Sequence, residues 1–254
     1  MVGRVVAQND GSVETWGLTE EEFAVLVARP EVRAMKSPAV FVLNINQAEQ
    51  ASSKMKAAKK SFIEDTIDNA VKYDVIIQVG HFPRIRGATG SEGTYIAEQD
   101  GTAYVATQIR GLLSETDYKF AVIGADAYKT GEKIDAQHFF RTKLFISLHL
   151  DGSSTPCASS ASLGYNPAFG RDQMQLFGVG LAIALGLNAR EFMDDNFTPN
   201  LSHFYSYRHS NSELAEGIVE MGELSCPEQE IKFLVGADQI AANLFTAIGF
   251  ALKE

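Results

Sequence analysis

Apolar and polar positions follow two different periods along the chain, and each change of period marks the boundary of an element. The run VIIQVG at residues 75–80 is apolar and β-branched, which predicts a strand buried in a parallel sheet. Similar runs alternate with stretches whose apolar residues recur at helical spacing. The predicted strands are 74–79, 119–124, 143–149 and 216–221, and the predicted helices are 94–114, 171–187, 227–235 and 236–251. This alternation predicts right-handed crossovers and an α/β fold, with a mostly parallel twisted sheet covered by helices.

The first 70 residues follow a different pattern. An Asp-Gly turn at Asp10 separates two short apolar runs, and Thr19 with Glu22 provides the capping pair of a helix. The expected elements are a hairpin of residues 2–7 and 13–16, a helix over 20–29, a strand at 38–45 and an amphipathic helix over 47–72. We therefore expect residues 1–70 to form a small N-terminal α+β extension or accessory domain, and residues 71–254 to form the main domain.

Composition and charge exclude two classes of protein. The formal net charge is −10 and no basic stripe is visible, which argues against nucleic-acid binding. The apolar run at residues 177–187 is too short to span a bilayer, and the N-terminus has no apolar signal region. We expect a protein with no signal peptide and no membrane span that is synthesised in the cytoplasm.

The chain contains two cysteines, Cys157 and Cys226. Two cysteines without CxxC spacing are too few for a disulfide framework. We therefore expect both to be free thiols, in keeping with synthesis in a reducing compartment.

Three predicted strands end in side chains suited to metal binding or proton transfer: His81, His149 and Glu220. Because the carboxyl ends of parallel strands meet at one edge of a sheet, we expect these side chains to converge. Glu98 lies on the apolar stripe of a predicted helix, so its carboxylate faces the interior and needs a partner. Two imidazoles and one carboxylate, with a fourth position for water, are the usual ligands of a catalytic zinc ion, and His81, Glu98 and His149 match this set. Glu220 is then placed to take a proton and return it.

Each candidate residue also has a purely structural interpretation. A histidine at a strand end is ordinarily packed or solvated, and the helix dipole alone favours a glutamate in a first turn. We favour the metal site because four such residues converge. The remaining histidines, interpreted as surface or supporting residues, are His138, His203 and His209.

With these residues in place, the chain resembles the zinc-dependent N-acetylmuramoyl-L-alanine amidases of the amidase-3 type, found among bacterial autolysins and phage endolysins. Four pieces carry the resemblance in the family's order, over roughly residues 74–251. They are VIIQVGH ending at His81, AEQD containing Glu98, LFISLHLDG containing His149, and GIVEMGELSCPEQE containing Glu220.

The resemblance implies that His81, Glu98 and His149 bind one zinc ion per chain and that Glu220 is the acid–base residue. It implies that the substrate is peptidoglycan, cleaved at the amide between N-acetylmuramic acid and L-alanine with zinc-bound water as nucleophile. It also implies that Arg208, in the segment FYSYRHS, lines the substrate groove. One departure is that Phe82-Pro83 follows the first histidine, where the family usually has a second glycine.

Three functions agree with these features. The first is a cell-wall amidase, an endolysin or autolysin that reaches the wall after release or by another export system. The second is a different zinc peptidase or carboxypeptidase acting on the stem peptide, and the third is a non-catalytic wall-binding or phage structural protein. Because bacterial walls are often anionic, the negative net charge predicts that lysis depends only weakly on salt. The sequence leaves the host, the peptide chemistry and the oligomeric state open.

Overall fold

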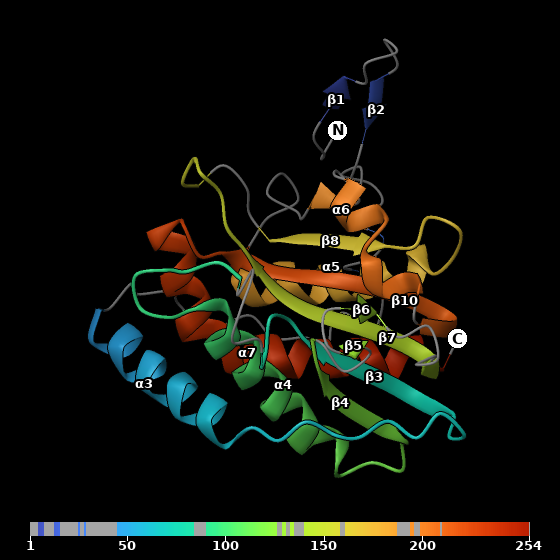
Figure 1. Cartoon of the computed structure of the whole chain (residues 1–254). Helices are drawn as coiled ribbons and strands as arrows, with labels where there is room; N and C mark the ends of the chain where they lie inside the picture. The colour runs from blue at the N-terminus through green and yellow to red at the C-terminus, as the bar shows by residue number, and fades with distance from the viewer. Residues whose placement is uncertain are drawn as a thin grey trace.

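Six strands form one sheet in the order β4-β3-β7-β10-β8-β9 (Figure 1). Their bounds are β3 Tyr73–Val79, β4 Phe120–Gly124, β7 Phe140–Asp151, β8 Ser162–Tyr165, β9 Asp194–Asp195 and β10 Ser210–Glu223. Strands β4, β3, β7 and β10 are parallel, β8 runs antiparallel to β10, and β9 is parallel to β8. The predicted α/β class with a mostly parallel sheet is therefore confirmed.

The structure is a computed structural model. It describes residues 5–7, 13–15, 25, 28, 45–83, 90–125, 129–130, 133–134, 140–157, 161–186, 194–195, 199–208 and 210–253.

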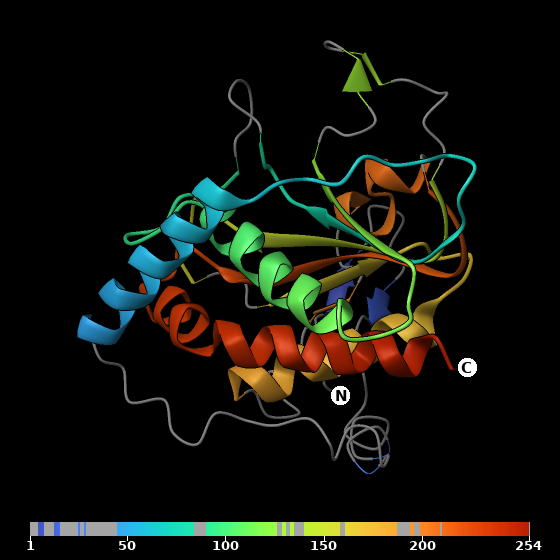
Figure 2. The ribbon, with the colours of Figure 1, turned by 90° about the horizontal axis from the view of Figure 1, so that it is seen from below.

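The two faces of the sheet are covered differently (Figure 2). Four helices lie on one face: α3 Ile45–Ser61, α4 Glu98–Leu113, α5 Arg171–Leu185 and α7 Pro227–Ala251. The opposite face carries a smaller apolar cluster of Ile76, Ala121, Ile123 and Phe145. Short segments pack over it, among them the 3-10 helix η1, Tyr205–Arg208, which follows the one-turn helix α6, Pro199–Ser202. Because both faces are covered, the central strands are apolar on both sides.

Part of the N-terminal prediction falls on described residues. Strand β1, Val5–Ala7, pairs antiparallel with β2, Val13–Thr15, which confirms the predicted hairpin. Of the predicted helix over 20–29, only Val25 and Ala28 are described, and both are helical. The predicted strand at 38–45 lies outside the described residues except for Ile45, which begins α3. A second hairpin joins β5, Lys129–Thr130, to β6, Lys133–Ile134.

The helix predicted over 47–72 is too long, because α3 ends at Ser61. Residues 62–68 instead have no regular secondary structure, and Glu64 and Asp65 hydrogen-bond to β4, the edge strand of the sheet. Asp65 N donates to Val122 O at 2.8 Å, and Val122 N donates to the Asp65 side chain at 2.7 Å. Asp65 thus satisfies backbone groups on the exposed edge of the sheet.

Helix α3 belongs to the same core as the main sheet. Ala48 and Met55 are buried in the large apolar cluster, and Ser52 Oγ donates to Tyr95 O at 2.8 Å. Helix α3 lies before residue 70, the predicted boundary between the two parts of the chain. That boundary stays a prediction.

The helices predicted at 227–235 and 236–251 form one continuous helix, α7. Gly236 lies inside it, at a cost of about 1 kcal/mol that burial of neighbours such as Phe233 and Leu234 outweighs. Among the described residues, α7 is the one helix long and apolar enough to cross a membrane. Over half of its most apolar window is buried within the protein, where it packs on α4 and α5, as a core helix does.

Candidate metal centre

The ligand atoms of His81, Glu98 and His149 all lie within 4.8 Å of one another. His149 Nδ1 is 3.0 Å from Glu98 Oε1, and His81 Nε2 is 3.7 Å from Glu98 Oε2. The two imidazole rings meet edge to face, with centroids 5.1 Å apart. The structure therefore brings together the three residues predicted as ligands. Two imidazole nitrogens and one carboxylate are a donor set that suits zinc, so these residues could hold that ion.

Glu98 opens α4 and is only 2% exposed. Its Oε1 accepts a hydrogen bond from Leu150 N at 3.0 Å, and its Oε2 accepts from Ser91 N at 2.8 Å. Burial acts to raise the pKa of Glu98, but the hydrogen bond to His149, the charges of both histidines and the Leu150 N–H outweigh it and lower that pKa. Glu98 is therefore held as an acceptor for whatever cation lies between it and the histidines.

Two glycines allow the ligands to approach. A Cβ at Gly80 would lie 2.8 Å from the His149 ring, and a Cβ at Gly90 would lie 2.4 Å from Glu98 Oε2. Gly90 also has a φ of 94°. Between them in sequence, His81 has a φ of 58°, a conformation that non-glycine residues rarely adopt and that is concentrated at functional sites. The backbone around His81 is thus shaped by the site rather than by ordinary turn preferences.

Glu220 lies beside this group at the end of β10, in register with His149 on β7. Its Oε2 is buried, and no described group forms a hydrogen bond with it. Burial raises the pKa of Glu220 well above its ordinary value, and the negative charges of Glu98 and Asp151 raise it further. A buried carboxyl with a raised pKa beside a metal-type group is the arrangement expected of an acid–base residue.

Two hollows meet at His81, His149 and Glu220. One, of about 480 Å³, is walled by polar residues that include Ser91, Glu92, Asp151, Ser153 and Ser225. The other, of about 420 Å³, is walled by Phe204, Tyr205, Arg208, His203, Leu201 and Ile218. The ligand group thus stands between two open arms of a cleft.

We call the hollow lined by Ser91 and Ser225 the polar arm and the one lined by Phe204 and Tyr205 the aromatic arm. The aromatic arm is built from the segment around η1. The Phe204 ring packs edge to face on the His149 ring, with centroids 5.4 Å apart. Arg208 and His203 both lie in this arm. The substrate-binding role that the resemblance implies for Arg208 stays a prediction. His138 and His209 lie outside the described residues.

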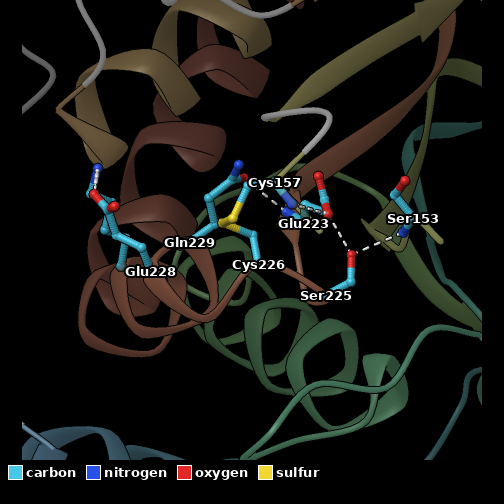
Figure 3. Close-up of a disulfide and its surroundings, with 8 residues drawn as sticks. Ser153, Cys157, Glu223, Ser225, Cys226, Glu228 and Gln229 are labelled. Atoms are coloured by element: carbon cyan, nitrogen blue, oxygen red, sulfur yellow. Dashed lines mark hydrogen bonds and ion pairs between the residues drawn. A yellow bond between two sulfur atoms is a disulfide. The ribbon is translucent and has the colours of Figure 1, made fainter. Parts of the chain in front are cut away.

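The prediction of two free thiols is wrong, because Cys157 and Cys226 form a disulfide (Figure 3). They are 69 residues apart in sequence, and only the fold brings the loop after β7 next to the start of α7. Glu223 accepts hydrogen bonds from Cys157 N and Ser225 Oγ beside the bridge. Ser225 Oγ also accepts from Ser153 N at 2.9 Å, so the disulfide borders the polar arm of the cleft.

Sequence reasoning missed several residues that support the ligands. Ser91 holds Glu98, and Ser147 Oγ lies 3.0 Å from His149 Nε2. Ser147 and Gln78 are the polar members of otherwise apolar strands, and both are 0% exposed. A polar residue inside an apolar run must find a buried partner, and this signal was present in the sequence.

No family model matches the chain, and no curated protein matches it. Several solved structures match the chain. An N-acetylmuramoyl-L-alanine amidase from Clostridium difficile 630 superposes with a TM-score of 0.54 at 18% identity, over 74% of this chain and 99% of that one. The catalytic domain of the amidase CwlV from Bacillus (Paenibacillus) polymyxa gives 0.53 at 16% identity, over 71% and 98%. The amidase AmiC2 of Nostoc punctiforme gives 0.52 at 13% identity, over 72% and 98%.

These matches show a shared fold: the chain has the fold of the N-acetylmuramoyl-L-alanine amidases, over nearly the whole length of those solved domains. At the carboxyl edge of its sheet this chain carries a His-Glu-His group that could hold a metal ion.

Proposed function

We propose that the protein is a zinc-dependent N-acetylmuramoyl-L-alanine amidase that cleaves the amide between N-acetylmuramic acid and L-alanine in peptidoglycan. The observation that carries this proposal is the convergence of His81, Glu98 and His149 in a fold shared with such amidases. These three residues would hold one zinc ion per chain and leave a fourth position open. The cleft is open on both sides of the group, which suits a substrate that continues in both directions from the scissile bond.

When bound, zinc supplies a Lewis acid that polarises the amide carbonyl and makes water acidic enough to attack at neutral pH. Glu220 takes the proton from the attacking water and passes it to the amine nitrogen as the carbon–nitrogen bond breaks. Its raised pKa supports this role, because it makes the carboxylate a stronger base in the first step and helps it to hold the proton for the second.

Arg208 is proposed to bind a carboxylate of the stem peptide in the aromatic arm of the cleft. It is exposed there and shares the arm with Glu220 and both histidines. An Arg208→Ala variant should bind zinc normally but show a roughly tenfold lower kcat/KM on wall fragments, mainly through KM, as expected for one lost charge-assisted hydrogen bond. An unchanged KM would contradict this role.

The Cys157–Cys226 disulfide supports action outside the reducing cytoplasm, because structural disulfides persist in oxidising compartments. We propose that the chain is made in the cytoplasm and works on the cell wall after release or export. Active protein recovered from the cell wall or the medium with both thiols free would contradict this proposal, and mass analysis after thiol alkylation measures it.

The proposed role of Glu220 is tested by a Glu220→Gln variant. This variant should keep about one zinc per chain and lose roughly 10²-fold or more of its rate of amine release from purified wall. Glu213→Gln is the matched control, since Glu213 lies on the same strand but is exposed and paired with Lys72 at 2.7 Å. Full activity of Glu220→Gln, or absence of zinc from protein prepared without chelators, would overturn the proposal.

A further inference from the structure

A buried hydrogen-bond chain leads to His149 from the face of the sheet opposite the helices. Gln78 on β3 and Ser147 on β7 are neighbours in register, and Ser206 of η1 lies over them. All three are 0% exposed. Gln78 Nε2 donates to Ala125 O at 3.2 Å, while Gln78 Oε1 lies 2.7 Å from Ser147 Oγ and 3.1 Å from Ser206 Oγ. His149 Nε2 lies 3.0 Å from Ser147 Oγ.

The direction of this chain follows from counting protons. A backbone carbonyl only accepts, so Ala125 O fixes the Gln78 amide with its NH₂ on that side and its oxygen toward the two serines. The Ser147 hydroxyl has one proton, and it donates that proton to Gln78 Oε1. Toward His149, Ser147 Oγ can therefore act only as an acceptor, so the ring must carry its proton on Nε2.

A neutral imidazole with its proton on Nε2 has a lone pair on Nδ1. That lone pair points at Glu98 Oε1, 3.0 Å away, and a carboxylate oxygen is also an acceptor. Two acceptors at this distance repel each other, so a cation must lie between them: either a second ring proton on Nδ1, which then donates to Glu98, or a metal ion in its place. The network thus prepares His149 Nδ1, rather than Nε2, as the atom that binds a metal ion.

We propose that Gln78 and Ser147 are positioning residues that fix the His149 tautomer and present its Nδ1 lone pair to the metal. The proposal rests on the zinc site proposed above and adds the atom used and the residues that select it. Ser206 donates to the same Gln78 oxygen, which ties η1 and the aromatic arm to the network. Because Ser147 donates to that oxygen by itself, Ser206 is not required for the tautomer. In the other tautomer, Ser147 would donate to His149 Nε2 and the ring proton would lie on Nδ1. Nδ1 would then have no lone pair with which to bind a metal ion.

Zinc affinity, measured by competition with a chromophoric chelator, distinguishes these arrangements without using enzymatic activity. Ser147→Ala should weaken zinc binding roughly 10–100-fold, the usual effect of removing the partner of a ligating histidine. Ser206→Ala is the matched control, because it removes a buried hydroxyl from the same network and should bind zinc as the wild type does. Circular dichroism of both variants checks that they fold.

A second measurement needs no variant of the network. In zinc-loaded wild-type protein with ¹⁵N-labelled histidine, NMR should show the His149 ring proton on Nε2, with the resonance assigned by its loss in His149→Gln. A proton on Nδ1, or Ser147→Ala binding zinc as tightly as the wild type, would overturn the inference and leave the proposed amidase untouched. Failure of wild-type protein to bind zinc would overturn both. Zinc binding with the expected tautomer but no cleavage of wall would remove only the proposed function.

Discussion

Two glutamates on β10, the buried Glu216 and the half-buried Glu220, point to the same face of the sheet, yet their surroundings give them different uses. Burial raises the pKa of both. Glu216 accepts a hydrogen bond from Asn166 Nδ2 at 2.6 Å and another from Ser210 Oγ, so its oxygens are occupied. Glu220 Oε2 has no such partner among the described residues, and Glu220 is one of the residues that line the cleft. Glu216 is therefore structural, and Glu220 is available for proton transfer.

The raised pKa of Glu216 makes a prediction about stability. Its pKa is higher in the folded than in the unfolded protein, so the folded state retains the proton to higher pH. This contribution is fully present below the unfolded value of about 4.3 and is lost as pH rises through the folded pKa. In urea titrations with a chelator present, the free energy of unfolding of Glu216→Gln should therefore fall less with rising pH than that of the wild type. Parallel curves would show that Glu216 does not contribute.

At the scale of elements, the first turn of α7 joins the two loops that border the ligands. Glu230 accepts hydrogen bonds from three successive backbone N–H groups just before α4, those of Thr94, Tyr95 and Ile96, at 2.7 to 3.1 Å. Cys226, the N-cap of the same helix, is bonded to Cys157 in the loop after β7. The start of α7 thus holds two segments in place: residues 94–96, which precede Glu98, and the loop after β7, which follows His149.

This arrangement predicts that the disulfide contributes substantially to stability. Cross-linking residues 69 apart lowers the entropy of the unfolded chain, which corresponds to about 4 kcal/mol in the loop-closure estimate. The Cys157→Ala/Cys226→Ala double variant should lose up to that amount in denaturant unfolding, and wild type treated with dithiothreitol should match it. Alkylation of two thiols in native, unreduced protein would contradict the disulfide itself.

The elements that the sequence predicted well are those defined by long, uniform apolar runs. Strand β3 was expected at 74–79 and spans Tyr73–Val79, because a buried β-branched run has few alternative structures. The end of α3 and the disulfide were not predicted. Both depend on contacts distant in sequence, an acidic side chain against the edge strand in one case and two loops brought together by the sheet in the other.

The sequence predicted the candidate ligands and the acid–base residue, but not the residues that hold them in place. His81 follows β3, and His149 and Glu220 lie near the ends of β7 and β10. Parallel strands bring these ends to one edge of the sheet whatever the details of packing. The roles of Ser91 and Ser147 depend on side-chain direction and hydroxyl orientation, which a pattern of residue types does not specify.

At the scale of the whole molecule, identity to the solved amidases is only 13–18%, while nearly the full length of their domains is shared. What the structures share is the fold, and this chain carries its His-Glu-His group at the carboxyl edge of the sheet. The active chemistry proposed here depends on that edge alone, so it can be tested on the complete protein with its natural substrate.

We propose that the residues at this edge cleave the bond between muramic acid and L-alanine, with His149 as a metal ligand. Mass analysis of purified peptidoglycan digested by wild type and by His149→Ala tests it most directly. The wild type should release stem peptides with a new N-terminal L-alanine and leave the glycan strands intact, and His149→Ala should release none. Free amino acids or cuts within the stem peptide would indicate a peptidase instead, and equal products from both proteins would contradict the account.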